Sequence, residues 1–324
     1  MTSRFAADSD GCLTSHLASI APNAKVEVLP VLSNDAIGGR ETVSSMAKRT
    51  NALLVVNGSY FHTTGEILGL MKLSGAIIST SQDGVRSAVG RSAGGKYLFG
   101  RVDYEGIVAL PNGLKVAVSG VNCERGEDMC VIYRPSFGAR TGTNPYGKEY
   151  IIQEGRVTAI TDGNSPLAAD TIVLSVHGKA QEAFAKLCVG DAVKLDETLT
   201  GEWNRAEWIV GAGPTLVTGG KVHITAQEEV FGTDVAGGRA PRTAIGITKD
   251  GTLLVAVIEG RHQTSRGATL TELGEWMKAH GAVEAINLDG GGSSVLWADG
   301  KCISRPSDGQ ERQVGNAIGI FAQK

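Results

Sequence analysis

The stretch Arg242-Thr-Ala-Ile-Gly-Ile-Thr-Lys-Asp-Gly-Thr-Leu-Leu-Val-Ala-Val-Ile258 places an Asp-Gly pair between two apolar runs. Asp-Gly is favoured in tight turns because both residues tolerate positive φ. The stretch therefore predicts a β-hairpin whose second strand runs from Leu253 to Glu259. Similar signals predict hairpins at Pro111-Asn-Gly113, Thr161-Asp-Gly163 and Ala298-Asp-Gly300.

Most other apolar segments are short and also bounded by turn residues, which is typical of strands. The further predicted strands are Leu53 to Val56, Tyr97 to Val102, Leu114 to Val118, Val131 to Tyr133, Tyr150 to Gln153, Thr171 to Val176 and Ala285 to Leu288. Three helices are expected, at Val43 to Asn51, at Ala180 to Leu187 and from Thr269, where Thr269-x-x-Glu272 forms a capping box and Gly281 ends the helix. The prediction is an α+β fold, dominated by mixed, largely antiparallel sheets.

An internal similarity links Arg86 to Val102 with Arg242 to Ile258 at a constant offset of 156. Five of 17 positions are identical, and Ser/Thr and Val/Ile exchanges stand beside them. Chance matching of Gly-rich strands is the alternative. A true pseudo-repeat, around 57–106 and 211–260, would make two similar hairpins the opposite walls of one site.

The sequence shows no linker-like run that would mark a boundary between domains. We therefore expect residues 1–40 to be an N-terminal extension or edge element and residues 41–324 to form a single catalytic domain. The first residues contain no apolar segment typical of a secretion signal. The protein is expected in the cytoplasm, or outside it if a signal segment was removed.

Composition excludes several classes of protein. Of the 324 residues, 44 are glycine, about twice the ~7% average, yet they follow no three-residue period and only 9 residues are proline. The formal charge of −3 argues against a nucleic-acid partner, and no apolar run is long enough for a membrane span. We therefore expect a soluble globular protein.

Neither the cysteines nor the histidines indicate a metal site. The five cysteines include no CxxC pair, which argues against a zinc site, and Cys123 and Cys130 could form a disulfide or stay reduced. The stretch Gly90-Arg-Ser-Ala-Gly94 matches a nucleophile elbow and overlaps a P-loop spacing. Both motifs require a following helix, whereas the next residues read as a strand.

The segment Asn287-Leu-Asp-Gly-Gly-Gly-Ser-Ser294 is the strongest chemical motif. Successive glycines let backbone N–H groups turn toward one point, which suits an anion; a flexible hairpin is the alternative. Arginine forks match phosphate oxygens, so Arg242, Arg261 and Arg312 are candidate phosphate ligands. Asp289 and Glu259 supply carboxylates at the ends of two predicted strands.

At these residues the sequence resembles the phosphodiester glycosidase family. The resemblance rests on motifs in order along residues ~50 to 320, namely Asn57-Gly-Ser-Tyr-Phe61, Pro241-Arg-Thr-Ala-Ile-Gly246, Val257-Ile-Glu-Gly-Arg261, Gly267-Ala-Thr-Leu270, Asn287-Leu-Asp-Gly-Gly-Gly-Ser-Ser294 and Asn316-Ala-Ile-Gly319. One departure is that Asn57-Gly-Ser-Tyr-Phe61 replaces the usual Asn-Gly-Gly-Phe-Phe.

The resemblance implies hydrolysis of a small sugar-1-phosphodiester to free sugar and a phosphomonoester. Because a phosphate leaves C1 readily, the chemistry needs charge stabilisation and one carboxylate at the anomeric carbon. We expect Asp289 in that place and Glu259 as the second carboxylate. The substrate-binding set is Asn57 on a sugar hydroxyl, Arg242, Thr243, Arg261, Gly290, Gly291, Gly292, Ser293, Ser294 and Arg312.

No cofactor is required by this scheme, and a divalent cation beside Asp289 stays an open alternative. Two rival functions use the same residues. A catalytically silent carbohydrate-binding module would usually carry more aromatic side chains than four Trp and six Tyr. A phosphodiesterase would break the P–O bond instead of the C1–O bond.

Overall fold

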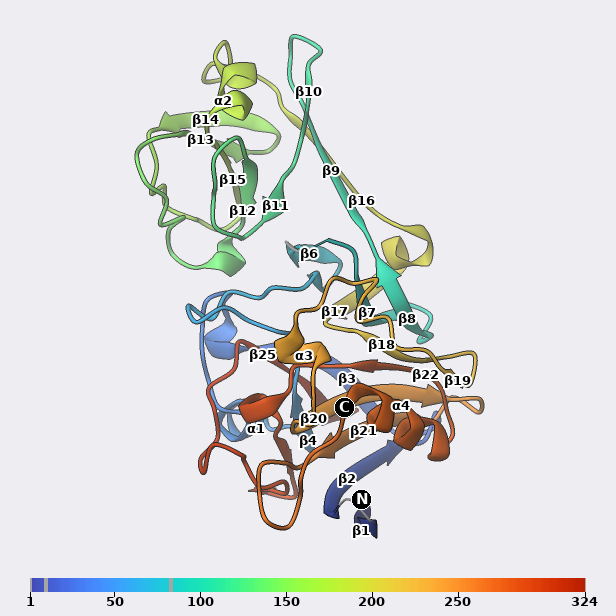
Figure 1. Cartoon of the computed structure of the whole chain (residues 1–324). Coiled ribbons are helices and arrows are strands. Elements are labelled where there is room, and N and C mark those ends of the chain that lie inside the picture. The colour runs from blue at the N-terminus through green and yellow to red at the C-terminus, as the bar shows by residue number, and fades with distance from the viewer. Residues whose placement is uncertain (1, 9–10, 82–83, 324) are drawn as a thin grey trace.

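The computed structural model describes residues 2–8, 11–81 and 84–323. They form a main body and a smaller lobe, which occupies the upper part of Figure 1. The lobe is built from the segment between β8 (Tyr97–Val102) and β17 (Ala206–Gly211). Two paired strands, β9 (Tyr104–Ala109) and β16 (Lys194–Leu199), rise from the body to the lobe (Figure 1).

The largest sheet of the body has seven strands in the order β1-β2-β21-β20-β22-β18-β19. Its strands are β1 (Thr2–Asp8), β2 (Gly11–Ile20), β18 (Thr215–Thr218), β19 (Lys221–Val222), β20 (Arg242–Thr248), β21 (Leu253–Ile258) and β22 (Ala282–Asn287). The predicted hairpin is confirmed as β20 and β21. Every residue of β21 is buried, as its unbroken apolar sequence suggests for a strand covered on both faces.

A second sheet of the body has five strands in the order β6-β5-β17-β7-β8. Its remaining strands are β5 (Met71–Leu73), β6 (Ala76–Ser79) and β7 (Arg86–Ser92). The third sheet has the order β24-β23-β4-β25-β3. It consists of β3 (Val26–Leu32), β4 (Leu54–Asn57), β23 (Leu296–Ala298), β24 (Lys301–Cys302) and β25 (Asn316–Ala322).

The two hairpins of the pseudo-repeat have the same register. Arg86 pairs with Val102 and Arg242 pairs with Ile258, and all six pairs of β7–β8 recur in β20–β21 at the offset of 156. The neighbouring strands agree as well, because Gly211 of β17 pairs with Ala88 while Asn287 of β22 pairs with Ala244. The sheets therefore repeat one strand arrangement, and the lobe is inserted where a helix connects β21 to β22 in the second copy.

The lobe contains a five-stranded sheet, β11-β12-β15-β13-β14, and the three-stranded sheet β10-β9-β16. The strands not yet given are β10 (Lys115–Ala117), β11 (Gly120–Val121), β12 (Cys130–Tyr133), β13 (Lys148–Gln153), β14 (Arg156–Thr161) and β15 (Thr171–Val176). Only the pairing of β11 with β12 is parallel among the described strands. The mixed, largely antiparallel prediction is therefore confirmed.

One predicted hairpin is wrong. The turn at Thr161-Asp-Gly163 leaves β14, but β14 and β15 lie on opposite edges of β13. The reason is the two-residue turn Glu154-Gly155, whose φ angles are 50° and 72°. It folds β14 directly onto β13, so only the other edge of β13 remains for β15.

The described residues form four α-helices, of which three were expected. They are α1 (Val43–Thr50), α2 (Lys179–Phe184), the one-turn α3 (Thr233–Ala236) and α4 (Leu270–Ala279). Short 3-10 helices occur at Ser33–Asp35, Pro135–Phe137, Gly201–Arg205 and Gly291–Ser293. The capping box of Thr269 and Glu272 is present, and Gly281 follows α4 with φ 92°. None of the described helices combines the length and the apolar character needed to cross a bilayer.

The main hydrophobic core lies between the three sheets of the body and includes Val28, Val89 and Ile245. A second cluster joins the β7 sheet to the lobe through residues such as Ala88 and Val176. Cys123 and Cys130 are both buried free thiols. The strands β1, β2 and β3 lie toward sheet edges, and the division of the chain at residue 40 stays a prediction.

Candidate active site

Asp289 lies where two sheets of the body meet, two residues beyond the end of β22. The N–H of Leu288 donates to the Thr243 carbonyl at 2.8 Å, and the N–H of Asp289 donates to the Gly58 carbonyl at 2.9 Å. From the end of β4, Asn57 Nδ2 donates to the Asp289 carbonyl at 2.7 Å. The main chain of Asp289 is therefore fixed from both sides, so its carboxyl group projects from a rigid base.

Asn57 has no exposed surface, and its side chain is fully engaged. Its Oδ1 accepts hydrogen bonds from Thr243 Oγ1 at 2.8 Å and from the Val295 N–H at 3.3 Å. The sequence predicts that this side chain binds a sugar hydroxyl, and that role stays a prediction. In the structure its hydrogen bonds hold the main chain of Asp289 against Thr243 and Val295.

Burial raises the pKa of Asp289 to about 6. The Gly290 N–H, which donates to Oδ1 at 2.8 Å, the nearby Ser293 hydroxyl and the charge of Arg312 all act to lower this pKa. The balance leaves a carboxyl group that exchanges its proton close to neutral pH, which suits general acid–base catalysis.

The structure brings two of the predicted arginines against the glycine run that follows Asp289. A Cβ added to Gly291 would lie 3.4 Å from Arg261 Nη2, and one added to Gly292 would overlap Arg312 Nη2 and Asp308 Oδ2. A Cβ added to Gly290 would instead meet the Pro241 carbonyl oxygen at 3.0 Å, with the aliphatic Cδ of Arg242 at 3.9 Å. The missing side chains at Gly291 and Gly292 thus make room for cationic groups against the backbone.

Arg242 is buried, with 2% of its surface exposed. Its Nε, Nη1 and Nη2 donate to the carbonyls of Ala268, Val235 and Gly238 at 3.0, 2.9 and 3.1 Å. Within the described chain no carboxylate forms an ion pair with it, and burial lowers its pKa. Arg242 therefore holds the loop around α3 while contributing an uncompensated positive charge beside the glycines.

Arg261 is exposed, and its side chain has no hydrogen-bond or ion-pair partner among the residues that the structure describes. Its backbone has φ 62°, an uncommon conformation for a residue other than glycine and one that often marks functional sites. Arg312 is already paired, because its Nε and Nη2 donate to Asp308 Oδ2 at 3.0 and 2.7 Å. Arg261 is thus the arginine most available to an incoming anion.

These residues fall inside a region that matches a known family. A sequence model of phosphodiester glycosidases matches residues 138–321, more than half of the chain. The chain belongs to the phosphodiester glycosidase family. The matched region contains Asp289, the glycine run and all three arginines.

Individual relatives of this chain are distant or match over short stretches. It is 41% identical over 80 residues, 25% of the chain, to the SPbeta prophage-derived uncharacterized protein YomE of Bacillus subtilis. It is 40% identical over 67 residues, 21% of the chain, to mouse N-acetylglucosamine-1-phosphodiester alpha-N-acetylglucosaminidase. The matched stretches make up only 12% and 13% of those two proteins.

The whole fold of this chain has a counterpart among solved structures. A crystal structure of a hypothetical protein from Synechocystis superposes with a TM-score of 0.87 at 25% sequence identity. The superposition covers 99% of this chain and 61% of the Synechocystis chain. The lobe and the body are therefore both present in a distant relative.

Glu259, the predicted second carboxylate, is not joined to Asp289 by any hydrogen bond. Its Oε1 accepts from His16 Nε2 at 2.7 Å and from the Arg305 N–H at 2.8 Å, and the residue is 7% exposed. Burial acts to raise its pKa, but these hydrogen bonds outweigh it and hold the pKa of Glu259 below the usual value. The structure uses Glu259 to link β2 to the Arg305 loop.

Tyr60 is a site residue to which sequence reasoning gave no role. Its hydroxyl donates to the Gly213 carbonyl at 2.9 Å and accepts from Asn287 Nδ2 at 2.8 Å. Burial raises the pKa of Tyr60, and the negative charge of Asp289 raises it further, so the phenol stays neutral beside that carboxylate. Its ring packs 5.5 Å from that of Phe231. The only signal was its place in the motif that begins at Asn57.

Several buried polar atoms near the motifs have no hydrogen-bond partner in the described part of the chain. They include Ser59 Oγ, Ser294 Oγ and Asn316 Nδ2. Asn316 lies against the start of the Asn57 motif, because its Oδ1 accepts from the Ser59 N–H at 3.0 Å. Unpaired buried polar groups are rare and call for a water or a ligand, so these atoms are candidates for bonds to hydroxyl groups.

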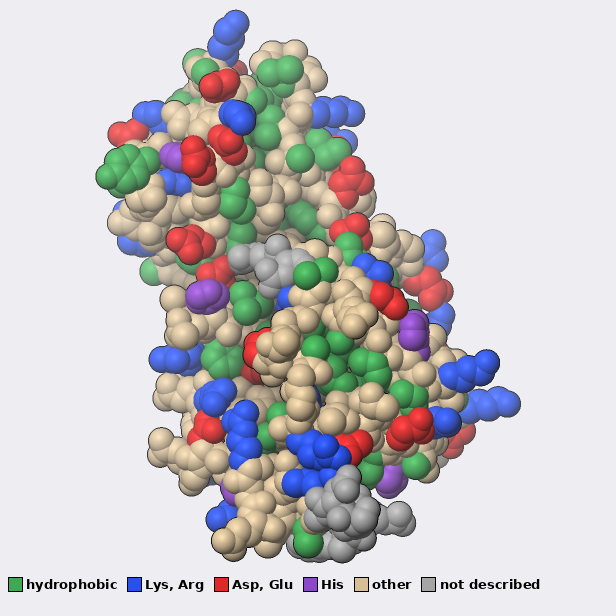
Figure 2. Space-filling model, viewed as in Figure 1, with side chains coloured by type: hydrophobic (Ala, Val, Ile, Leu, Met, Phe, Trp, Pro, Cys, Tyr) green, Lys and Arg blue, Asp and Glu red, His purple; other side chains and the backbone are tan. Residues whose placement is uncertain are grey.

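No group of three or more His, Cys, Asp or Glu side chains within the described ranges has a metal-binding arrangement. On the face shown in Figure 2, positive and negative side chains are interspersed rather than separated.

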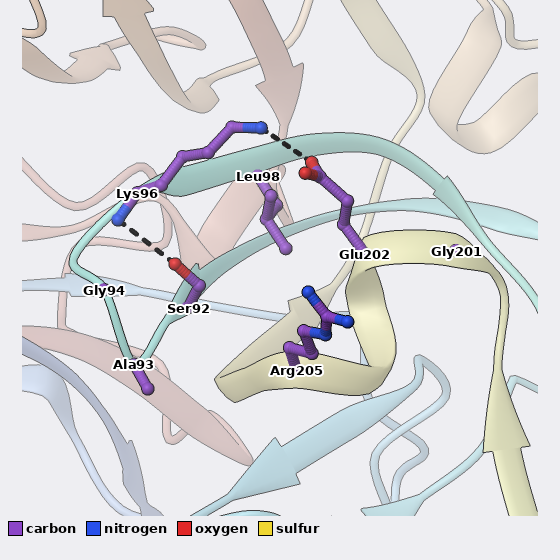
Figure 3. A pocket seen from close by; sticks show the side chains of 8 residues that line it. All are labelled: Ser92, Ala93, Gly94, Lys96, Leu98, Gly201, Glu202 and Arg205. Atoms are coloured by element: carbon purple, nitrogen blue, oxygen red, sulfur yellow. Dashed lines mark hydrogen bonds and ion pairs between the residues drawn. The ribbon is translucent and has the colours of Figure 1, made fainter.

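From the Gly90-Arg-Ser-Ala-Gly94 stretch, Ser92, Ala93 and Gly94 line a cavity of about 550 Å³ between the β7–β8 hairpin and the 3-10 helix Gly201–Arg205. Ser92 ends β7, and its hydroxyl accepts a hydrogen bond from the Lys96 N–H at 3.2 Å (Figure 3). A strand, not a helix, follows this turn. Neither a nucleophile elbow nor a P-loop is formed, as predicted.

Proposed function

We propose that this chain hydrolyses small sugar-1-phosphodiesters, breaking the C1–O bond to release a free sugar and a phosphomonoester. Membership of the family supports a hydrolase of this type. The observation that carries the proposal is the position of Asp289 at the head of three glycines, two of which, Gly291 and Gly292, lie against the guanidinium groups of Arg261 and Arg312.

The phosphate group would occupy the side of the glycine run. Arg261 is free, Arg242 adds a buried positive charge, and Arg312 lies against Gly292. Backbone N–H groups and arginines stabilise the charge that develops on the leaving oxygen. The free Arg261 makes an anionic substrate more favourable than a neutral one.

The sugar would lie against the wall formed by Ser59, Ser294 and Asn316, with Tyr60 beside Asp289. Asp289 is the proton-transfer group, because a carboxyl with pKa near 6 can both hold and release a proton at neutral pH. Asp289→Ala is expected to lose turnover by about three orders of magnitude while staying folded. Near-normal activity would refute this assignment.

The decisive experiment is hydrolysis in water labelled with oxygen-18, across a panel of sugar-1-phosphodiesters. The name of the mouse relative makes an N-acetylglucosamine-1-phosphodiester the first member of the panel. C1–O cleavage places the label in the sugar. Label in the phosphate would identify the rival phosphodiesterase, and absence of turnover together with sugar binding would favour a carbohydrate-binding module.

A further inference from the structure

Hydrolysis at an anomeric carbon uses two carboxyl groups, one to protonate the leaving oxygen and one to activate water or the carbon itself. The inference made here rests on the function proposed above. Asp289 supplies one of the two. Glu259 is a poor second because it is 7% exposed and its Oε1 already accepts two hydrogen bonds from the protein.

Asp308 is the carboxylate that the fold brings to the glycine run. A Cβ on Gly292 would overlap Asp308 Oδ2, so this oxygen lies directly against the segment that begins at Asp289. Arg312 connects the two acids, since it donates two hydrogen bonds to Asp308 Oδ2 and its charge acts on Asp289.

Asp308 is also accessible to water. Its side chain is 34% exposed, and it lines a cavity of about 490 Å³ together with Arg40, Thr42, Gln310, Glu311, Arg312 and Gln313. Arg40 forms no ion pair within the described chain and is the second cation of this cavity, while the carboxylate of Glu311 accepts a hydrogen bond from the Ser44 N–H at 3.0 Å. The volume is large enough for part of a small ligand.

We propose that Asp308, rather than Glu259, is the second catalytic carboxylate. Water attacks C1 and forms the new C–O bond while its proton passes to the Asp308 carboxylate. The bond from C1 to the phosphate oxygen breaks with its electron pair, and protonated Asp289 gives its proton to that oxygen. Exchange with solvent then removes the proton from Asp308 and restores the one on Asp289.

The sequence alone does not reveal a catalytic role for Asp308. Asp308 precedes Arg312 by four residues in a loop, where the two look like an ordinary surface ion pair, worth about 0–1 kcal/mol. Only the close approach of both side chains to Gly292 shows that the Asp308–Arg312 pair packs against the glycine run. Two carboxyl groups in different environments, one buried and one paired with an arginine, are the usual arrangement for an acid and a base.

The test compares Asp308→Asn with Asp289→Asn and with the control Asp299→Asn, an exposed acid in the β23–β24 turn. Each variant is checked for an unchanged melting temperature and assayed on the phosphodiester that the wild type turns over. Asp308→Asn is expected to lose about 10²–10⁴-fold in kcat, whereas Asp299→Asn keeps the wild-type rate.

Two further readouts separate chemistry from structure. Azide needs no base, so it should restore turnover to Asp308→Asn and yield a glycosyl azide. A glycosyl fluoride needs little acid assistance, so it should restore turnover to Asp289→Asn but not to Asp308→Asn. The inference is overturned, while the proposed function stands, if Asp308→Asn has a normal kcat. It is also overturned if azide does not restore turnover to Asp308→Asn and Asp308→Glu is as inactive as Asp308→Asn. If the wild type releases no sugar from any phosphodiester, both fail.

Discussion

Asn57 donates from Nδ2 to the carbonyl of Asp289 at 2.7 Å, although 232 residues separate them in the chain. The contact joins the end of β4 in one sheet to the end of β22 in another. The hydrogen bond that Asn57 Nδ2 donates therefore falls on the residue that precedes the glycine run. The two motifs with the clearest resemblance to the family are thus one structural unit, in which the first orients the second.

Removal of the Asn57 amide should therefore impair catalysis without touching the substrate. In Asn57→Ala the Asp289 carbonyl and the Val295 N–H lose their partner in a buried place, at a cost of about 1–3 kcal/mol each. Misplacement of the carboxyl group should lower kcat by about 10–10²-fold, with a smaller change in KM. Steady-state kinetics and urea unfolding measure both effects. Asn23→Ala, at an exposed turn, is the control, and a normal kcat in Asn57→Ala would contradict the positioning role.

The pKa of Asp289 predicts how stability depends on pH. In the folded state this pKa is about 6, above the ordinary 3.8, so the folded protein binds the proton more tightly. Stability contributed by the protonated group is fully present below pH ~4 and is lost as the pH rises through ~6. At pH 7, the free energy of unfolding of Asp289→Asn should therefore exceed that of the wild type by an amount on the order of 2–3 kcal/mol, and the variant should unfold at a higher denaturant concentration. This difference should shrink toward pH 4. A variant less stable than wild type at pH 7 would show that burial does not penalise the charged group.

The hairpins and the pseudo-repeat could be predicted because they depend on local signals. The Lys249-Asp-Gly251 turn and the apolar run after it define β20 and β21, and the offset of 156 is visible in the residues themselves. The hairpin at Thr161-Asp-Gly163 failed because a nearer turn, Glu154-Gly155, occupied one edge of β13 first. Two segments can compete to pair with the same edge of a strand, and a single turn signal does not show which of them pairs there.

The candidate site was foreseeable only where its residues are consecutive. Asp289 to Ser294 form one motif. Tyr60, by contrast, belongs to the site through its hydrogen bonds with Gly213 and Asn287, which are too far from it in the sequence to be predicted from a motif. Glu259 looked like a second acid because it ends a strand beside Gly260-Arg261. Its side chain is directed by His16 on β2, a strand that pairs with β21 from more than 200 residues away.

The three arginines should have different mutational signatures. Arg242 donates to three carbonyls, so Arg242→Ala is expected to lower stability by roughly 2–5 kcal/mol as well as activity. Arg261 has no partner in the described structure, so Arg261→Ala should leave the melting temperature unchanged. It should reduce kcat/KM for a phosphodiester by about 10–10³-fold, with little effect on a neutral aryl glycoside of the same sugar. Equal impairment on both substrates would argue against phosphate contact by Arg261.

Glycine at position 292 should be required for its lack of volume. Its φ is outside the left-handed region, so alanine fits the backbone, but the added Cβ would overlap Asp308 Oδ2 and Arg312 Nη2. Gly292→Ala should therefore displace this ion pair and lower kcat/KM by about 10–10²-fold at a stability cost of about 1–3 kcal/mol. Gly94→Ala is the matched control, because its Cβ would meet nothing closer than 3.8 Å. If Gly292→Ala keeps full activity, the Asp308–Arg312 pair can move away without consequence, and its place against the glycine run has no part in the reaction.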